Sequence, residues 1–224
     1  MLFRPSPIIP KPCGRTLSLI ENNVIANGFH EGLQASDLAE EKHGTNNVHH
    51  ITMRNNIFTN LEGYFAVILY HGYQDHFTFV NNVVIDASYI GSFHHSPNGT
   101  IMNNIFLNGG SAHYGDHSEE GTVWDYNIYY PDFDKAYKRA GYDQNSLFGI
   151  HPRVSVPSDF KGPDGIWNTE DDPPRLIIEE GSPIIDAGKD LSHLGFSEDS
   201  RGVKRPQGKG WDLGAVEWSP EDDR

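Results

Sequence analysis

The chain has 224 residues, of which 17 are Lys or Arg and 31 are Asp or Glu, so its formal net charge is −14. This length fits one domain with its own core, and the acidic charge argues against nucleic-acid binding, because few cations could neutralise phosphates. The single cysteine, Cys13, excludes an intramolecular disulfide and a Cys-based zinc site, and no apolar run reaches the length of a transmembrane helix. Residues 1–15 form a Pro-rich lead.

One short phrase, in which two adjacent Asn residues are flanked by apolar residues, recurs along the chain. Its second Asn falls at five positions: Asn23, Asn56, Asn82, Asn104 and, in a weaker copy, Asn127. The successive spacings are 33, 26, 22 and 23 residues, and the apolar residues alternate with others as they do in β-strands. We call each stretch from one phrase to the next a repeat.

Each repeat is too short to bury an apolar face alone, so we expect the repeats to stack as a solenoid of short parallel strands with a shared core. Asn suits a sharp bend between two strands because it tolerates a left-handed backbone. Its side-chain amide can also bond the same amide in the next repeat. The phrase therefore predicts a column of hydrogen-bonded Asn residues at a bend.

Residues 16–130 resemble the right-handed parallel β-helix of the pectin-lyase-like superfamily, whose coils contain phrases of the type I-x-N-N-x-I/F. Three later motifs resemble the closing module of its secreted and cell-surface members: GPDGIWNTEDD at 162–172, GSPIIDAG at 181–188 and DLGAVE at 212–217. The resemblance implies an all-β fold, a right-handed parallel β-helix of about five coils. An irregular C-terminal closing module over residues 131–224 belongs to the same domain. It also implies a secreted, periplasmic or cell-surface location.

The front of the chain departs from this pattern. Such β-helices begin with more coils and a capping helix, whereas here the first Asn pair closely follows the Pro-rich lead. We expect a fragment of a longer protein, a short natural variant, or a first coil that a partner covers. An uncovered parallel edge also predicts self-association through the first coil.

Counting forward from the second Asn of each repeat aligns two columns of residues on one sheet. The first column is Ser36, His71, His95 and His117, and its neighbour is Ala35, Tyr70, His94 and Asp116. Adjacent strands are about 4.8 Å apart, so stacked imidazoles would touch and be partly neutral at pH 7, which suits acid–base catalysis. We predict Asp116, His117, His95 and His71 as catalytic residues. The alternative is a ladder of solvated or structural histidines.

The face around these columns predicts a sugar-binding surface, and the resemblance implies a polysaccharide or oligosaccharide partner. The candidate substrate-binding residues are Tyr70, His94, His113, Tyr114, Asp75 and Glu119. Glycoside hydrolysis needs two carboxylates about 5–9.5 Å apart, which stacked strands can supply. β-Elimination is less favoured, because Lys42 and Arg54 are the only cations within residues 16–130. The alternative function is a non-catalytic glycan-binding or cell-surface structural module.

The acidic segment 164–172 resembles an oxygen-rich calcium loop, with Asp164, Asn168, Glu170 and Asp172 as candidate ligands. The alternative is a loop held by Asx turns. A transition metal bound by His71, His95 and His117 is a less favoured possibility.

The carboxylates of the tail are expected to be structural. We predict that Asp186 and Asp212 pair with Arg201 or Arg205 to close the last coil.

Overall fold

A computed structural model describes residues 18–28, 32–36, 48–70, 74–93, 97–109, 113–114, 121–131 and 142–220. Within these ranges every regular element is a β-strand, apart from the 3₁₀ turn η2 (Ser192–Leu194). None of the described helical segments has the length and hydropathy of a membrane-spanning helix. The predicted all-β class is therefore confirmed.

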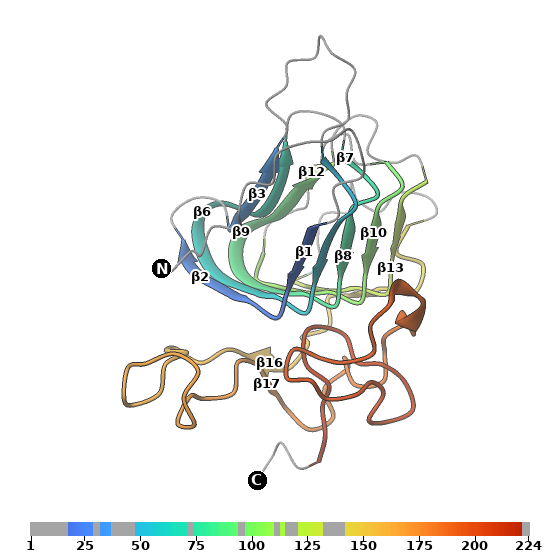
Figure 1. Cartoon of the computed structure of the whole chain (residues 1–224). Coiled ribbons are helices and arrows are strands. Elements are labelled where there is room, and N and C mark those ends of the chain that lie inside the picture. The colour runs from blue at the N-terminus through green and yellow to red at the C-terminus, as the bar shows by residue number, and fades with distance from the viewer. Residues whose placement is uncertain are drawn as a thin grey trace.

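Two parallel sheets form the upper part of the molecule in Figure 1. The first sheet has the order β1 (Ser18–Glu21), β5 (Ile51–Arg54), β8 (Thr78–Val80), β10 (Thr100–Met102) and β13 (Val123–Asp125). The second has the order β15 (Leu147–Phe148), β14 (Ile128–Tyr130), β11 (Ile105–Leu107), β9 (Val83–Phe93), β6 (Ile57–Tyr70) and β2 (Val24–Gly28). In this second sheet β3 (Leu33–Ser36) also pairs with β6, and β12 (His113–Tyr114) with β9.

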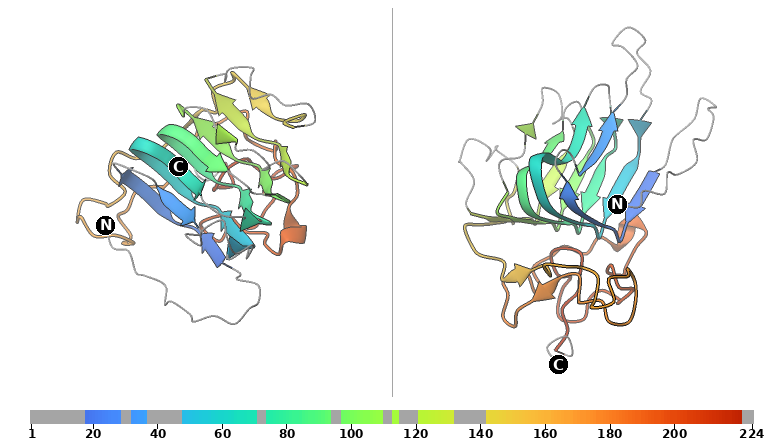
Figure 2. Two further views of the ribbon diagram at one scale, coloured as in Figure 1. Left: turned by 90° about the horizontal axis from the view of Figure 1, so that it is seen from above. Right: turned by 90° about the vertical axis from the view of Figure 1, so that its left-hand side faces the viewer.

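The chain alternates between the two sheets, and each repeat lays its strands beside those of the next repeat in parallel register (Figure 2). Two small pairs complete the strands: β4 (Val48–His49) with β7 (Gln74–Asp75), and the antiparallel β16 (Val154–Ser155) with β17 (Ile177–Ile178). Among the described residues no strand of one large sheet pairs with a strand of the other. Parallel pairing is thus established, while closure into a right-handed coil stays a prediction.

The Asn–Asn phrases lie at the bend between the two sheets. The first residue of each pair has a left-handed backbone, with φ of 60° at Asn22, 53° at Asn55 and Asn81, and 58° at Asn103. Asn adopts this conformation more readily than most residues, because its short polar side chain bonds locally. This explains why the bend is built with Asn.

The second Asn of each pair forms the predicted ladder. The backbone N–H and the Nδ2 of Asn56 each donate to Oδ1 of Asn82 at 3.0 Å, and those of Asn82 donate to Asn104 at 2.9 and 3.3 Å. The same pattern runs from Asn23 to Asn56 and from Asn104 to Asn127. Each Nδ2 from Asn56 onward also donates to a backbone carbonyl of the preceding repeat. The predicted Asn column is confirmed.

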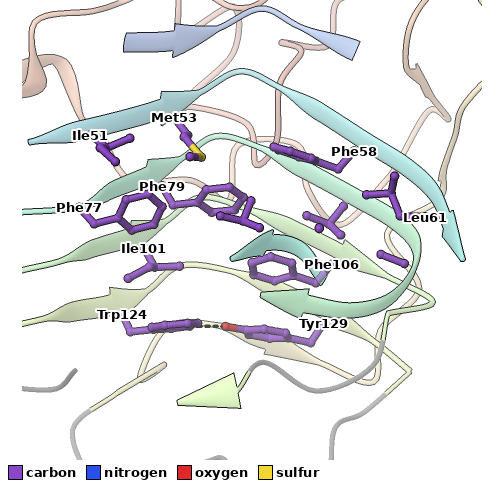
Figure 3. Packing of buried hydrophobic residues seen from close by; sticks show 14 residues of the cluster. Ile51, Met53, Phe58, Leu61, Phe77, Phe79, Ile101, Phe106, Trp124 and Tyr129 are labelled. Carbon is purple, nitrogen blue, oxygen red and sulfur yellow. Dashed lines mark hydrogen bonds between the residues drawn. The ribbon is translucent and has the colours of Figure 1, made fainter. Parts of the chain in front are cut away.

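A stack of aromatic rings fills the space between the two sheets (Figure 3). Successive ring centroids along Phe58, Phe79, Phe106, Tyr129 and Phe148 are 6.0, 6.5, 5.0 and 4.8 Å apart. The opposite face of the second sheet is also buried, because Ile57, Val83, Ile105 and Ile128 pack against the tail that lies beneath the sheets in Figure 1. Burial on both faces explains the continuous apolar runs after each Asn pair.

The first Asn of the pairs holds this tail. Asn55 Nδ2 donates to the carbonyl of Glu198, Asn81 Nδ2 to those of Asp212 and Gly214, and Asn103 Nδ2 to that of Lys189. At Gly214, φ is +87° and an added Cβ would lie 2.5 Å from Ile105, so this position needs glycine. The two Asn residues of a pair thus have different partners: the second bonds the next repeat and the first bonds the tail.

We expect Asn82→Ala to lower the free energy of unfolding by about 3 kcal/mol, because the N–H and Nδ2 of Asn56 would lose their acceptor inside the protein. Chemical denaturation monitored by circular dichroism measures this. The control is Asn145→Ala, an exposed Asn bonded to Asp125, which should cost less than about 1 kcal/mol. Equal costs for the two variants would contradict a stabilising role for the ladder.

Candidate functional site

The predicted catalytic column lies outside the described residues. This holds for Asp116, His117, His95 and His71, and for the candidate substrate-binding residues His94 and Glu119. The catalytic prediction therefore stays a prediction, as does the transition metal at His71, His95 and His117.

The other four candidate substrate-binding residues lie in strands whose backbone is described. Tyr70 ends β6, Asp75 ends β7, and His113 and Tyr114 form β12. Strands β6, β9 and β12 run parallel in the second sheet, so Tyr70 and Tyr114 come to the same end of that sheet. Asp75 lies in the separate β4–β7 pair.

The strand register corrects the alignment of the columns by one residue in the first and fourth repeats. The alignment placed Ala35 beside Tyr70, but Ser36 pairs with Tyr70. It also placed Asp116 beside His94, which puts residue 115 beside Phe93, but Tyr114 pairs with Phe93. In the second and third repeats Leu69 pairs with Phe93, as predicted. The register of β6 against β9 shifts by two residues between Leu61 and Phe65, and the alignment of Tyr70 with His94 had allowed for these two residues. A shift of one residue moves a side chain to the other face of a strand.

The acidic loop, residues 162–172, brings three carboxylates together. Oxygens of Asp164, Asp171 and Asp172 lie within 4.8 Å of one another. Two of the four predicted calcium ligands, Asp164 and Asp172, belong to this group, and Asp171 joins them. Glu170 does not belong to it. The amide oxygen of Asn168 accepts a hydrogen bond from Nη2 of Arg175 at 2.8 Å.

Hydrogen bonds within the loop orient these carboxylates. Asp172 accepts from the N–H groups of Gly162 at 3.0 Å and Asn168 at 2.6 Å, and Asp171 accepts from Thr169 Oγ1 at 2.8 Å. The bond from Thr169 lowers the pKa of Asp171, and the bond from the Gly162 N–H lowers the pKa of Asp172. Both carboxylates are thus ionised at neutral pH, and the donor set of hard oxygens fits calcium.

The tip of the acidic loop exposes apolar side chains. Ile166 is 61% exposed and Trp167 is 48% exposed, and the Trp167 ring stacks on Phe160 with a centroid distance of 6.3 Å. Arg175, at the base of the loop, donates through Nη1 to the carbonyl of Asn22 at 3.0 Å. This bond ties the loop to the bend of the first repeat.

The buried ion pair of the tail differs from the prediction. Arg205 pairs with Glu217 at 2.7 Å, both side chains being fully buried, and Arg201 pairs with Asp199 at 3.0 Å. Asp212 instead accepts the backbone N–H groups of Asp186 and Trp218. Burial raises the pKa of Asp212 to about 6. This network closes the tail, and its carboxylates are occupied by internal donors. Glu217, within the DLGAVE motif, was the partner that the sequence pattern did not identify.

Asp143 lies at the end of the Asn ladder, beside Ser146, and the sequence pattern did not identify it. Its Oδ1 accepts hydrogen bonds from Ser146 Oγ at 2.6 Å and from Tyr129 Oη at 3.1 Å, and Tyr129 Oη in turn accepts from Trp124 Nε1 at 2.6 Å (Figure 3). Burial raises the pKa of Asp143 to about 6, although these hydrogen bonds oppose the shift. The signal in the sequence is the break of the phrase at Ser146, which stands where another Asn would continue the ladder.

Comparisons with protein-family models, with curated proteins and with solved structures find no match for this chain. Its chemistry must therefore be inferred from its own residues. Among the described residues, the acidic loop has exposed carboxylates that a ligand could reach, whereas Asp143, Asp212 and Glu217 are held by internal hydrogen bonds.

If calcium binds the acidic loop, calcium at ten times its dissociation constant should stabilise the protein by about 1.4 kcal/mol, because the ion binds only the folded state. Thermal unfolding with and without calcium measures this. Asp171→Asn should abolish the increase, whereas Asp190→Asn, at an exposed carboxylate outside the cluster, should retain it. An unchanged melting temperature of the wild-type protein would contradict the calcium prediction.

Asp143 should make stability depend on pH. Because its folded-state pKa is above its unfolded value, its contribution is complete below about pH 4 and is lost as the pH rises through about 6. We expect Asp143→Asn to flatten this part of the profile. The difference in unfolding free energy between the variant and the wild type should shift in favour of the variant by up to roughly 3 kcal/mol between pH 4 and pH 7.5. Urea unfolding across this range measures it, and parallel profiles would contradict the assignment.

Proposed function

We propose that the protein is a carbohydrate-active, right-handed parallel β-helix that cleaves a polysaccharide by glycoside hydrolysis outside the cytoplasm. The observation that supports this proposal is the parallel register of β6, β9 and β12, in which Leu69 pairs with Phe93 and Phe93 with Tyr114. Phe93 and Tyr114 therefore lie level with each other at one end of the sheet, and Tyr70 lies one residue beyond that level on β6. A row of aromatic residues that crosses the strands suits an extended sugar chain, because aromatic side chains present apolar faces to sugar rings.

The proposed catalytic groups are the residues that directly follow these strand ends. Asp116 acts as general acid or base, and His71, His95 and His117 act as acid–base or substrate-orienting partners. Asp75 and Glu119 are the candidates for the second carboxylate that hydrolysis requires. Calcium, bound by Asp164, Asp171 and Asp172, has a structural role in the acidic loop and no role in the reaction.

Two alternatives are less favoured. β-Elimination of a uronate needs cations beside the acidic sugar, and residues 16–130 contain only Lys42 and Arg54. Arg54 is moreover engaged by Glu21, with Nη2 at 2.6 Å from the carboxylate. A non-catalytic glycan-binding module is the second alternative, and the exposed Trp167 beside the acidic loop supports it as a possible stacking surface for sugar.

A panel of neutral and acidic polysaccharides tests the proposal. We expect release of reducing ends without the ultraviolet absorbance of an unsaturated product. Asp116→Asn should lower the rate by about 10² to 10⁴, the usual contribution of a general acid or base. The matched control is Asp86→Asn, an exposed position with φ of 53° that Asn tolerates, and it should leave the rate unchanged.

The possible results separate the alternatives. An unsaturated product identifies elimination, and binding without any product identifies the glycan-binding module. Full activity of Asp116→Asn, with turnover retained, would remove Asp116 from the catalytic assignment.

A further inference from the structure

We propose that the open edge of the first repeat binds a strand–Asn bend–strand segment of another polypeptide, which adds to the sheets in parallel as one more repeat. This edge consists of β1, β2 and β3. The first two strands end the order of the two large sheets, and no described strand pairs with their outer sides. The inference does not depend on the glycan activity.

Two hydrogen-bonding groups at this edge have no partner among the described residues. From Asn56 onward, each ladder Asn accepts the N–H and the Nδ2 of the preceding Asn through its Oδ1. No described residue donates to Oδ1 of Asn23. In later repeats the N–H that follows the second Asn donates to the carbonyl of the preceding second Asn, as Ile57 does to Asn23 and Val83 to Asn56. The corresponding N–H of Val24 has no such acceptor among the described residues.

The apolar core is only partly covered at this edge. Ile20, Ile25 and Leu33 pack against the first core cluster but are only partly buried. Their neighbours in the next repeat, Met53, Phe58 and Val67, are completely buried. One added repeat would cover the three partly buried side chains and remove their apolar surface from water.

The hydrogen-bonding groups at this edge determine which kind of segment can bind there. The segment must supply a backbone N–H and a side-chain amide to Asn23, and a backbone carbonyl to Val24, so its bend residue is Asn. Residues 1–17 of this chain contain no Asn or Gln. A second copy stacked head to tail does not fit either, because the ladder ends at Ser146, whose hydroxyl accepts from Asn127 and has no amide group. Addition of a strand to an exposed sheet edge is a known mode of peptide recognition.

The probe is a synthetic peptide that copies residues 77–87 of this chain, FTFVNNVVIDA. Within the peptide, an Asp in place of the second Asn removes the amide donor and sets a carboxylate against Oδ1 of Asn23. An Asp in place of the first Asn has the same charge but leaves the ladder residue unchanged, and is the matched control. We expect binding by fluorescence anisotropy, weakened at least about tenfold by the first change and less than about threefold by the second.

Hydrogen exchange of the full chain supplies the second measurement. Binding of the unmodified peptide should slow exchange of the Val24 N–H, while the amide of Asn145, at the other end of the ladder, should be unaffected. Absence of binding, or equal loss with both peptide variants, would overturn the proposal. A dimer in analytical ultracentrifugation in which the Val24 N–H is already protected without peptide would also overturn it, because a second copy would then occupy the edge.

Discussion

The structure depends on one constraint: a primary amide that is removed from water must have partners for both its N–H groups and its oxygen. The ladder residues from Asn56 to Asn127 are completely buried. Asn56, Asn82 and Asn104 meet this requirement through an Asn at the same height in the next repeat, and Asn127 meets it through Ser146. The ladder therefore fixes the register between repeats. With the register fixed, Phe58, Phe106 and Tyr129 lie above one another and their rings can stack.

The neighbouring Asn of three of the pairs, Asn55, Asn81 and Asn103, has a different partner because its backbone is left-handed. Its side chain leaves the bend on the side of the tail, where backbone carbonyls of residues 189–214 are its acceptors. Arg205 extends this contact, since its buried guanidinium bonds both Glu217 and the amide oxygen of Asn55. Removing one member of such a buried pair is costly, because the other charge stays buried without its partner. The tail is thus a part of the core and not an appendage to it.

The periodic part of this molecule could be predicted from the sequence, because the Asn phrase indicates both the bend between the sheets and the ladder of Asn side chains. The parallel strands and the Asn column follow directly from Asn56, Asn82 and Asn104. The residue register beyond the bend could be predicted only in part. The first repeat has one residue more between β2 and β3 than the count assumed, and the fourth has one fewer between β11 and β12. The partner of Arg205 was equally hidden: Glu217 meets it only after the tail has folded back across the repeats.

The position of the tail restricts how this chain can change in evolution. The tail binds Asn55, Asn81 and Asn103 together, across three adjacent strands. An inserted or deleted repeat between them would move one of these Asn residues by a full strand spacing, about 4.8 Å, and break its bond to the tail. Repeat number can therefore change more readily before Asn55, where the tail bonds the bend through Arg175 and the backbone carbonyl of Asn22, a group that any repeat supplies, but not between these three residues. Solenoid proteins usually lengthen by internal duplication, and here duplication is compatible with the tail only outside the three repeats that it spans.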